Sequence, residues 1–176
     1  MGDNASGIYH IDLVDRITNF NPVGISHHGE HVNGIVGGAA IIDPLAGSIA
    51  PHVNLIDHLY DFILPESGAM FHDYGMSITN NSYAVVLGDC SYAGTYDAYA
   101  QFVDTLALQY PYLLHVFASG NDGSNNCTPY LPGFATTAGG YQPAKNNIVV
   151  GSITDYLEQA NDESRGPVKL PLNQTK

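Results

Sequence analysis

The chain has 176 residues, and its 17 acidic residues outnumber its 5 Lys and Arg residues to give a formal net charge of −12. This length predicts one domain or a piece of a larger one, and a hydrophobic fraction of 44% argues against disorder. The shortage of basic residues argues against nucleic acid as a partner, and no stretch approaches the ~20 apolar residues that a membrane span needs. No basic region and apolar run follow Met1, so no secretory signal is visible.

The first half of the chain predicts one buried helix, two strands and a short helix. Residues 32–40 are small and mostly apolar, which is typical of a buried helix. An apolar run at residues 53–60 predicts a strand. Residues 66–74 predict a short helix, and residues 77–83 predict a second strand.

The second half continues the alternation of helices and strands. Large side chains recur at helical spacing over residues 96–110, which predicts an amphipathic helix that ends at Pro111. Apolar runs at residues 113–118 and 147–151 predict two more strands, and residues 122–140 are rich in Gly, Asn, Pro and Thr, as in a long surface loop. Apolar strands alternating with helices indicate an α/β domain with a parallel sheet, in which working residues collect at the carboxyl ends of the strands.

The two cysteines, Cys90 and Cys127, allow one intramolecular disulfide. A disulfide is expected if the protein is exported, because oxidising compartments preserve such bonds. The alternative is a pair of unpaired, small apolar side chains. The sequence leaves both open.

Three histidines and one carboxylate lie within residues 27–31, the densest group of titratable side chains in the chain. One hypothesis is a zinc site that uses His27, His28 and His31, because histidines three positions apart share a helix face. The His-Glu-x-x-His pattern of zinc peptidases is missing, however. The other hypothesis is a histidine at the start of a helix that serves as a general base, since neutral imidazole accepts protons near pH 7.

Two sequence blocks resemble the subtilisin-like serine peptidases. Residues 28–35, His-Gly-Glu-His-Val-Asn-Gly-Ile, are similar to the family's His-Gly-Thr-His-Val-Ala-Gly-Ile block. Residues 117–123, Phe-Ala-Ser-Gly-Asn-Asp-Gly, resemble its Ala-Ala-Gly-Asn-Asp-Gly segment. Further similar segments follow in the family's order at residues 47–51, 77–83, 142–152 and 164–167. The resemblance implies a three-layer fold with a mostly parallel sheet flanked by helices, incomplete at both ends, so that residues 1–176 form a partial peptidase domain.

The same resemblance implies three catalytic residues. His28 matches the general base, and Asn121 matches the amide that stabilises the oxyanion. The family's aspartate precedes a His-x-Asp-Leu element, which residues 10–13 supply, and Asp3 stands at the matching distance. Asp12 and Asp15 are its rivals, although each is also suited to capping a turn.

The primary specificity pocket is expected between two short segments. By resemblance they are Ser82, Tyr83 and Ala84 on one side, and Ala118, Ser119 and Gly120 on the other. Two departures from the family pattern are Glu30 and Asn33, which replace the usual Thr and Ala. A carboxylate that approached His28 would favour the imidazolium form and handicap a general base.

The nucleophile of this family belongs to a Gly-Thr-Ser motif, which the sequence does not contain. The resemblance therefore implies a serine endopeptidase whose present chain is inactive alone. The alternatives are a non-catalytic peptide-binding relative and, with less support, a zinc-dependent hydrolase. The expected partner is a peptide or protein substrate, and the expected location is secreted or at the cell surface. No cofactor is required, although calcium is common in the family. No metal ligands are assigned.

Overall fold

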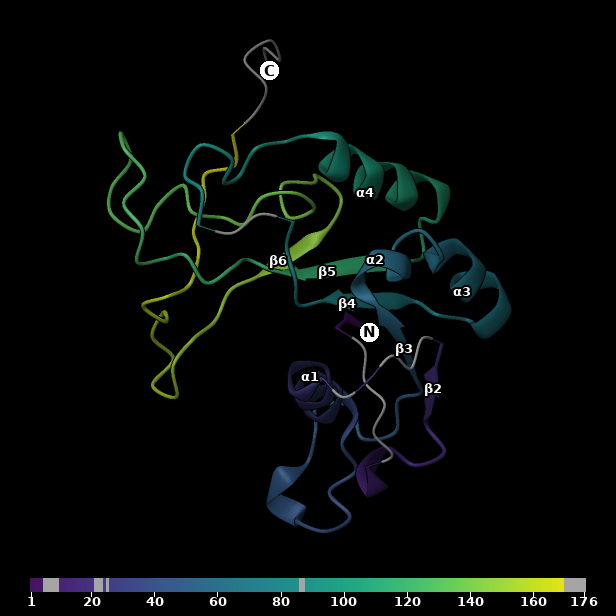
Figure 1. Cartoon of the computed structure of the whole chain (residues 1–176). Helices are drawn as coiled ribbons and strands as arrows, with labels where there is room; N and C mark the ends of the chain where they lie inside the picture. Colours follow the sequence, from purple (N-terminus) through teal and green to yellow (C-terminus); the bar gives the residue numbers. More distant parts are fainter. Residues whose placement is uncertain (5–9, 21–23, 25, 86–87, 170–176) are drawn as a thin grey trace. The chain divides into compact units, whose positions relative to one another are not determined.

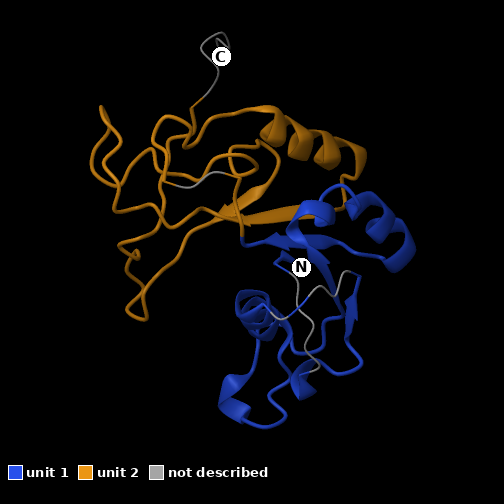
Figure 2. Cartoon of the chain, viewed as in Figure 1, with its two compact units in different colours: residues 1–82 blue, residues 83–176 orange. Residues whose placement is uncertain are grey.

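The computed structural model describes residues 1–4, 10–20, 24, 26–85 and 88–169. The chain divides into two compact units, Met1–Ser82 (unit 1) and Tyr83–Lys176 (unit 2), shown in Figure 2. Each unit combines parallel strands with helices, so the predicted α/β class is confirmed. None of the helices in the described ranges is both long and apolar enough to cross a membrane.

Within its described ranges, unit 1 has four parallel strands in the order β2-β3-β1-β4 (Figure 1). Their bounds are Gly2–Asp3 for β1, Ile17–Asn19 for β2, Leu55–Leu59 for β3 and Ile78–Asn81 for β4. The predicted strands at residues 53–60 and 77–83 are confirmed as β3 and β4. The central strand β1 pairs Gly2 with His58 on one side and with Asn81 on the other, so the carboxyl ends of these three strands share one edge.

The helix α1, His27–Gly37, corrects the prediction of a buried helix over residues 32–40. It begins earlier because the side chain of Ser26 caps it, accepting a hydrogen bond from the backbone nitrogen of Gly29 at 3.2 Å. It is also less buried than predicted, since Ile35 is 53% exposed. His28 therefore lies in the first turn of the helix, not ahead of it.

The core of unit 1 seats α1 against the sheet. Leu13 and Leu55 are buried there, and the partly buried side chains of Val32 and Val36 from α1 pack against them. A Cβ added at Gly37 would lie 3.0 Å from Leu55 Cδ1, so glycine allows the close approach of helix and strand. This packing fixes the position of the first turn of α1 relative to the end of β1.

Two further helices and two 3₁₀ turns in the described part of unit 1 connect or extend the strands. The helix α3, Ser67–Tyr74, confirms the prediction for residues 66–74. The short helix α2, Tyr60–Ile63, follows β3 directly and contacts β1. Two 3₁₀ turns are η1 at Ile11–Leu13, between β1 and β2, and η2 at Pro44–Ala46, between α1 and β3.

The described residues of unit 2 include two parallel strands and one long helix, all of them predicted. The strands are β5, Leu114–Ala118, and β6, Ile148–Val150, and the helix is α4, Ala98–Gln109. The helix begins later than predicted because Asp97 caps it, accepting from the backbone nitrogens of Tyr99 and Ala100. Tyr96 stays outside the helix.

A disulfide and a buried carboxylate hold the loops of unit 2. Cys90 and Cys127 form a disulfide, which settles the alternative that the sequence leaves open. Asp104 of α4 accepts hydrogen bonds from the backbone nitrogens of Lys145 and Asn146 at 2.8 and 2.9 Å, and from the hydroxyl of Tyr96 at 2.7 Å. Residues 122–140 contain neither helix nor strand, as predicted, but the expectation of a surface loop is wrong for residues 135–140, which are buried.

Candidate functional site

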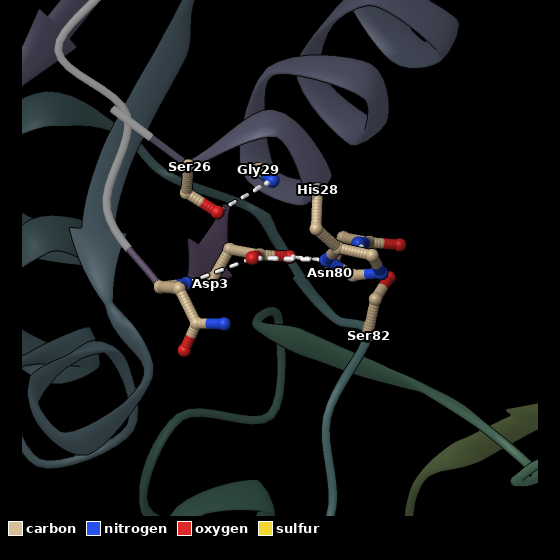
Figure 3. A network of polar contacts seen from close by, with 7 residues as sticks. Asp3, Ser26, His28, Gly29, Asn80 and Ser82 are labelled. Carbon is tan, nitrogen blue, oxygen red and sulfur yellow. Dashed lines mark hydrogen bonds and ion pairs between the residues drawn. The ribbon is translucent and has the colours of Figure 1, made fainter. Parts of the chain in front are cut away.

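A histidine and an aspartate meet at the carboxyl end of β1 (Figure 3). The Nδ1 atom of His28 lies 2.8 Å from Oδ2 and 3.0 Å from Oδ1 of Asp3. The carboxylate is the buried partner, with 4% of its side chain exposed, whereas 55% of the His28 side chain is exposed. Because an ionised carboxylate only accepts hydrogen bonds, Nδ1 donates to it and Nε2 remains as the proton acceptor.

The backbone fixes both members of this pair. Asp3 ends the central strand of unit 1, and the backbone nitrogen of Asn4 donates to its Oδ1 at 2.7 Å. His28 is held by the first turn of α1, whose geometry depends on the Ser26 cap. The imidazole therefore meets a carboxylate that is already oriented, which fixes its tautomer.

Ser82, predicted to bind substrate, comes to the same edge of the sheet. The pairing of Gly2 with Asn81 places Ser82 level with Asp3, one residue beyond β4. The side-chain nitrogen of Asn80 donates to the Ser82 hydroxyl at 3.0 Å, and Figure 3 shows both residues with the His28–Asp3 pair. The structure thus gathers three polar segments that are far apart in the sequence.

The rival aspartates have other roles. The Asp12 carboxylate accepts from the backbone nitrogen of Ile41 at 2.7 Å, and Asp15 occupies a left-handed turn with φ of 60°. Glu30, the residue expected to disturb the base, has its Oε2 atom 3.7 Å from Nδ1 of His27. The carboxylate that meets His28 is therefore that of Asp3.

The zinc hypothesis gains no support from the described part of the chain. Within those ranges, no group of three or more His, Cys, Asp or Glu side chains is placed to hold a metal ion. His28 faces Asp3, and the almost fully exposed His27 faces Glu30. His27 and His28 therefore contact different carboxylates.

Asn121 lies in unit 2, on an exposed loop that follows β5. The loop is rigidly placed, because the hydroxyl of Ser164 accepts from the backbone nitrogen of Asp122 at 2.9 Å. Gly120 has φ of +116°, and a Cβ there would lie 2.8 Å from the Ser164 hydroxyl oxygen, so the position requires glycine. The Asn121 amide is thereby presented on a fixed turn at the end of a strand.

Gln142 joins the two predicted walls of the specificity pocket within unit 2. Its side-chain nitrogen donates to the carbonyl oxygen of Tyr83 at 2.7 Å and to that of Ala118 at 3.3 Å, and only 2% of the residue is exposed. Ala84 follows Tyr83 and is half-buried, and Ser119 is buried and donates its backbone N–H to Val150 of β6. Sequence reasoning missed Gln142, since a single amide in a loop has no periodic signal.

The structure therefore brings together Asp3, His28 and Ser82 in unit 1, and Tyr83 and Ala118 in unit 2. Asn121 belongs to unit 2 and stays a prediction as an oxyanion donor. No protein-family model matches the chain, and no curated protein sequence does so either. Any assignment of function therefore rests on the chemistry of the described residues.

Proposed function

We propose that the chain carries the acid–base machinery of a serine endopeptidase of the subtilisin type. The observation that supports this most is the hydrogen-bonded pair of a buried Asp3 carboxylate and an exposed His28 imidazole, 2.8 Å apart at a strand end. A general base has to reach its substrate while its orienting acid is shielded from water. The pair meets both requirements.

In this mechanism His28 takes the proton of a serine hydroxyl through Nε2 and later returns it to the leaving amine. Asp3 holds the imidazole tautomer and stabilises the imidazolium that forms. The Asn121 amide donates to the carbonyl oxygen as negative charge develops, and an acyl-enzyme is the intermediate. The sequence has no Gly-Thr-Ser segment, so the nucleophile comes from outside these 176 residues and the chain alone is inactive.

The substrate in this proposal is an extended peptide. Its backbone pairs with the segments at Ser82–Ala84 and Ala118–Gly120, as in strand addition to a sheet edge. No cofactor takes part in the chemistry. The Cys90–Cys127 disulfide supports a secreted or cell-surface location, because such bonds persist in oxidising compartments.

The test uses the native gene product, captured with an antibody raised against this chain, and a fluorophosphonate probe that labels activated serines. The expected result is one labelled serine outside the 176 residues, with labelling and peptide cleavage both lost in His28→Ala. The 176-residue chain alone should show no label.

Two outcomes would overturn the proposal. A label that persists in His28→Ala would remove the base from the mechanism. A native product that binds extended peptides but takes up no label would be a non-catalytic peptide-binding relative.

A further inference from the structure

Gln142 donates one buried amide to two backbone segments of unit 2. Its Nε2 atom lies 2.7 Å from the carbonyl oxygen of Tyr83 and 3.3 Å from that of Ala118, and only 2% of the residue is exposed. Carbonyl oxygens can only accept hydrogen bonds, so the NH₂ group of the amide is the end that faces them. The two hydrogens of this group therefore serve the two segments that are expected to form the walls of the specificity pocket.

The loop that leads to this glutamine is anchored to both segments by its backbone as well. The carbonyl oxygen of Gly139 accepts from the backbone nitrogen of Val85 at 3.2 Å, and the backbone nitrogen of Ala138 donates to the carbonyl oxygen of Ser119 at 2.9 Å. Gly140 has φ of +106°, and a Cβ there would lie 2.5 Å from Cγ2 of Val85, so this position requires glycine. The Gln142 side chain is thus presented from a fixed backbone.

The other end of the Gln142 amide has no partner. Its Oε1 atom is buried, and no hydrogen bond from the described residues reaches it. A buried acceptor without a donor is destabilising, so stability alone does not explain a glutamine at this position. Exceptions of this kind are expected at functional sites. What the arrangement gains is the pair of hydrogen bonds to Tyr83 and Ala118.

An aromatic cluster holds the same two segments independently of the amide. The ring of Tyr141 stacks on that of Phe117 with centroids 5.7 Å apart, and it meets the ring of Tyr83 edge-on at 5.8 Å. Burial of large apolar side chains contributes more to folding than one hydrogen bond does. Loss of the Gln142 amide should therefore loosen the two walls without unfolding unit 2.

We propose that Gln142 is a positioning residue that sets the spacing between the two walls of the specificity pocket. This inference rests on the proposed peptidase function. Gln142 is too buried to touch a substrate and acts through the backbone of Tyr83 and Ala118. The turn that carries Asn121 has an anchor of its own in the hydroxyl of Ser164. Substrate binding and side-chain selectivity therefore depend on Gln142, whereas turnover does not.

The experiment compares Gln142→Met with the parent in the native gene product, using peptide substrates that differ only in the side chain before the cleaved bond. Methionine keeps the length of the side chain but donates no hydrogen bond. KM should rise about tenfold with kcat within about twofold, because the lost contacts bind substrate and transition state equally. The ratio of kcat/KM for a large over a small side chain should rise several-fold as the walls separate. Gln101→Met, at an exposed position of α4, is the matched control and should change neither constant.

A second variant, Gln142→Asn, keeps the amide on a side chain that is one methylene shorter. It can reach at most one of the two carbonyl oxygens, so its KM should lie between those of the parent and Gln142→Met. Thermal unfolding of the 176-residue chain checks that each variant folds, and Gln142→Asn decides the matter if Gln142→Met does not.

The outcomes separate this inference from the proposed function. Parent-like KM and selectivity in a folded variant, or a fall in kcat with KM unchanged, would overturn the positioning role and leave the peptidase proposal in place. Failure of both variants to fold would make Gln142 a purely structural residue. A parent product that cleaves no peptide would end the proposed function and the positioning role with it.

Discussion

Two of the histidine–carboxylate pairs in the described part of unit 1 are of nearly equal length and opposite burial. The His28–Asp3 pair measures 2.8 Å with the histidine 55% and the acid 4% exposed, whereas the His58–Glu66 pair measures 3.0 Å with the histidine 1% and the acid 47% exposed. The length of the histidine–carboxylate hydrogen bond therefore does not distinguish a candidate general base from a structural histidine. The difference is which partner meets the solvent.

The location of each histidine explains the contrast. His58 belongs to β3, and its ring stacks on Phe20 with centroids 5.7 Å apart and also contacts Phe62. An imidazole packed in this way cannot meet a substrate. His28 sits in the first turn of a helix, where the same chemistry is open to an incoming hydroxyl.

The sharpest way to break this comparison is to neutralise the acid of each pair. Asp3→Asn should lower peptide hydrolysis by the native gene product about 10⁴-fold, because the imidazole then adopts the wrong tautomer. Glu66→Gln should change the rate by no more than about twofold, since its histidine takes no part. Steady-state kinetics of the two variants checks this, and equal effects would end the distinction between the pairs.

The second test is stability, and in each pair the buried member should matter more. His58→Ala and Asp3→Ala should each lower the free energy of unfolding by about 2–4 kcal/mol, because each removes a buried side chain and its contacts. Glu66→Ala and His28→Ala should cost about 1–3 kcal/mol, because each leaves the buried partner without one hydrogen bond but removes fewer packed contacts. Urea unfolding measures all four, and the reverse ranking in either pair would contradict the burial argument.

His115 extends the comparison to a histidine in the core of unit 2. Burial lowers the pKa of its imidazole from 6.5 to about 4, because the charged form is poorly solvated there. The folded state then binds fewer protons, so stability is complete above pH 6.5 and falls as the pH drops toward 4. The loss should reach about 3 kcal/mol in denaturant titrations, and a folded His115→Gln variant should lack this part of the pH dependence.

The smallest expected effect concerns the cap that places His28. Ser26→Ala removes the acceptor for the backbone nitrogen of Gly29 and should cost about 1 kcal/mol. Ser26→Asp should restore the loss, since aspartate caps helices as well as serine does. Thermal unfolding compares the Ser26→Ala and Ser26→Asp variants. Equal melting temperatures would show that the cap does not stabilise the first turn of α1.

Sequence reasoning recovered the elements that carry an apolar run or a helical period, including the three-residue strand β6, and missed β1 and β2. The strand β3 and the helix α4 carry enough apolar residues in register to reveal their period. The strands β1 and β2 have two and three residues and belong to no apolar run, and their pairing depends on distant partners. The start of α1 was missed because Ser26 is followed by polar residues, so the capping signal precedes no apolar run.

The site shows the same division between local and distant information. The resemblance of residues 28–35 led to His28, whose Nδ1 lies 2.8 Å from the Asp3 carboxylate, and the catalytic roles of both residues stay predictions. Gln142 could not be identified from the sequence, because its hydrogen bonds to Tyr83 and Ala118 join segments 59 and 24 residues away. A pocket in unit 1 that Leu13, Ile35 and Ile49 line was missed for the same reason, as its walls come from three separate segments.

The bridge between Cys90 and Cys127 spans 37 residues and ties the loop before α4 to the loop after β5. A host cytoplasm rich in glutathione would keep the two thiols apart during synthesis. Recombinant material should therefore be made in a periplasm or secretory pathway, or refolded with an oxidant, before any of its properties are measured.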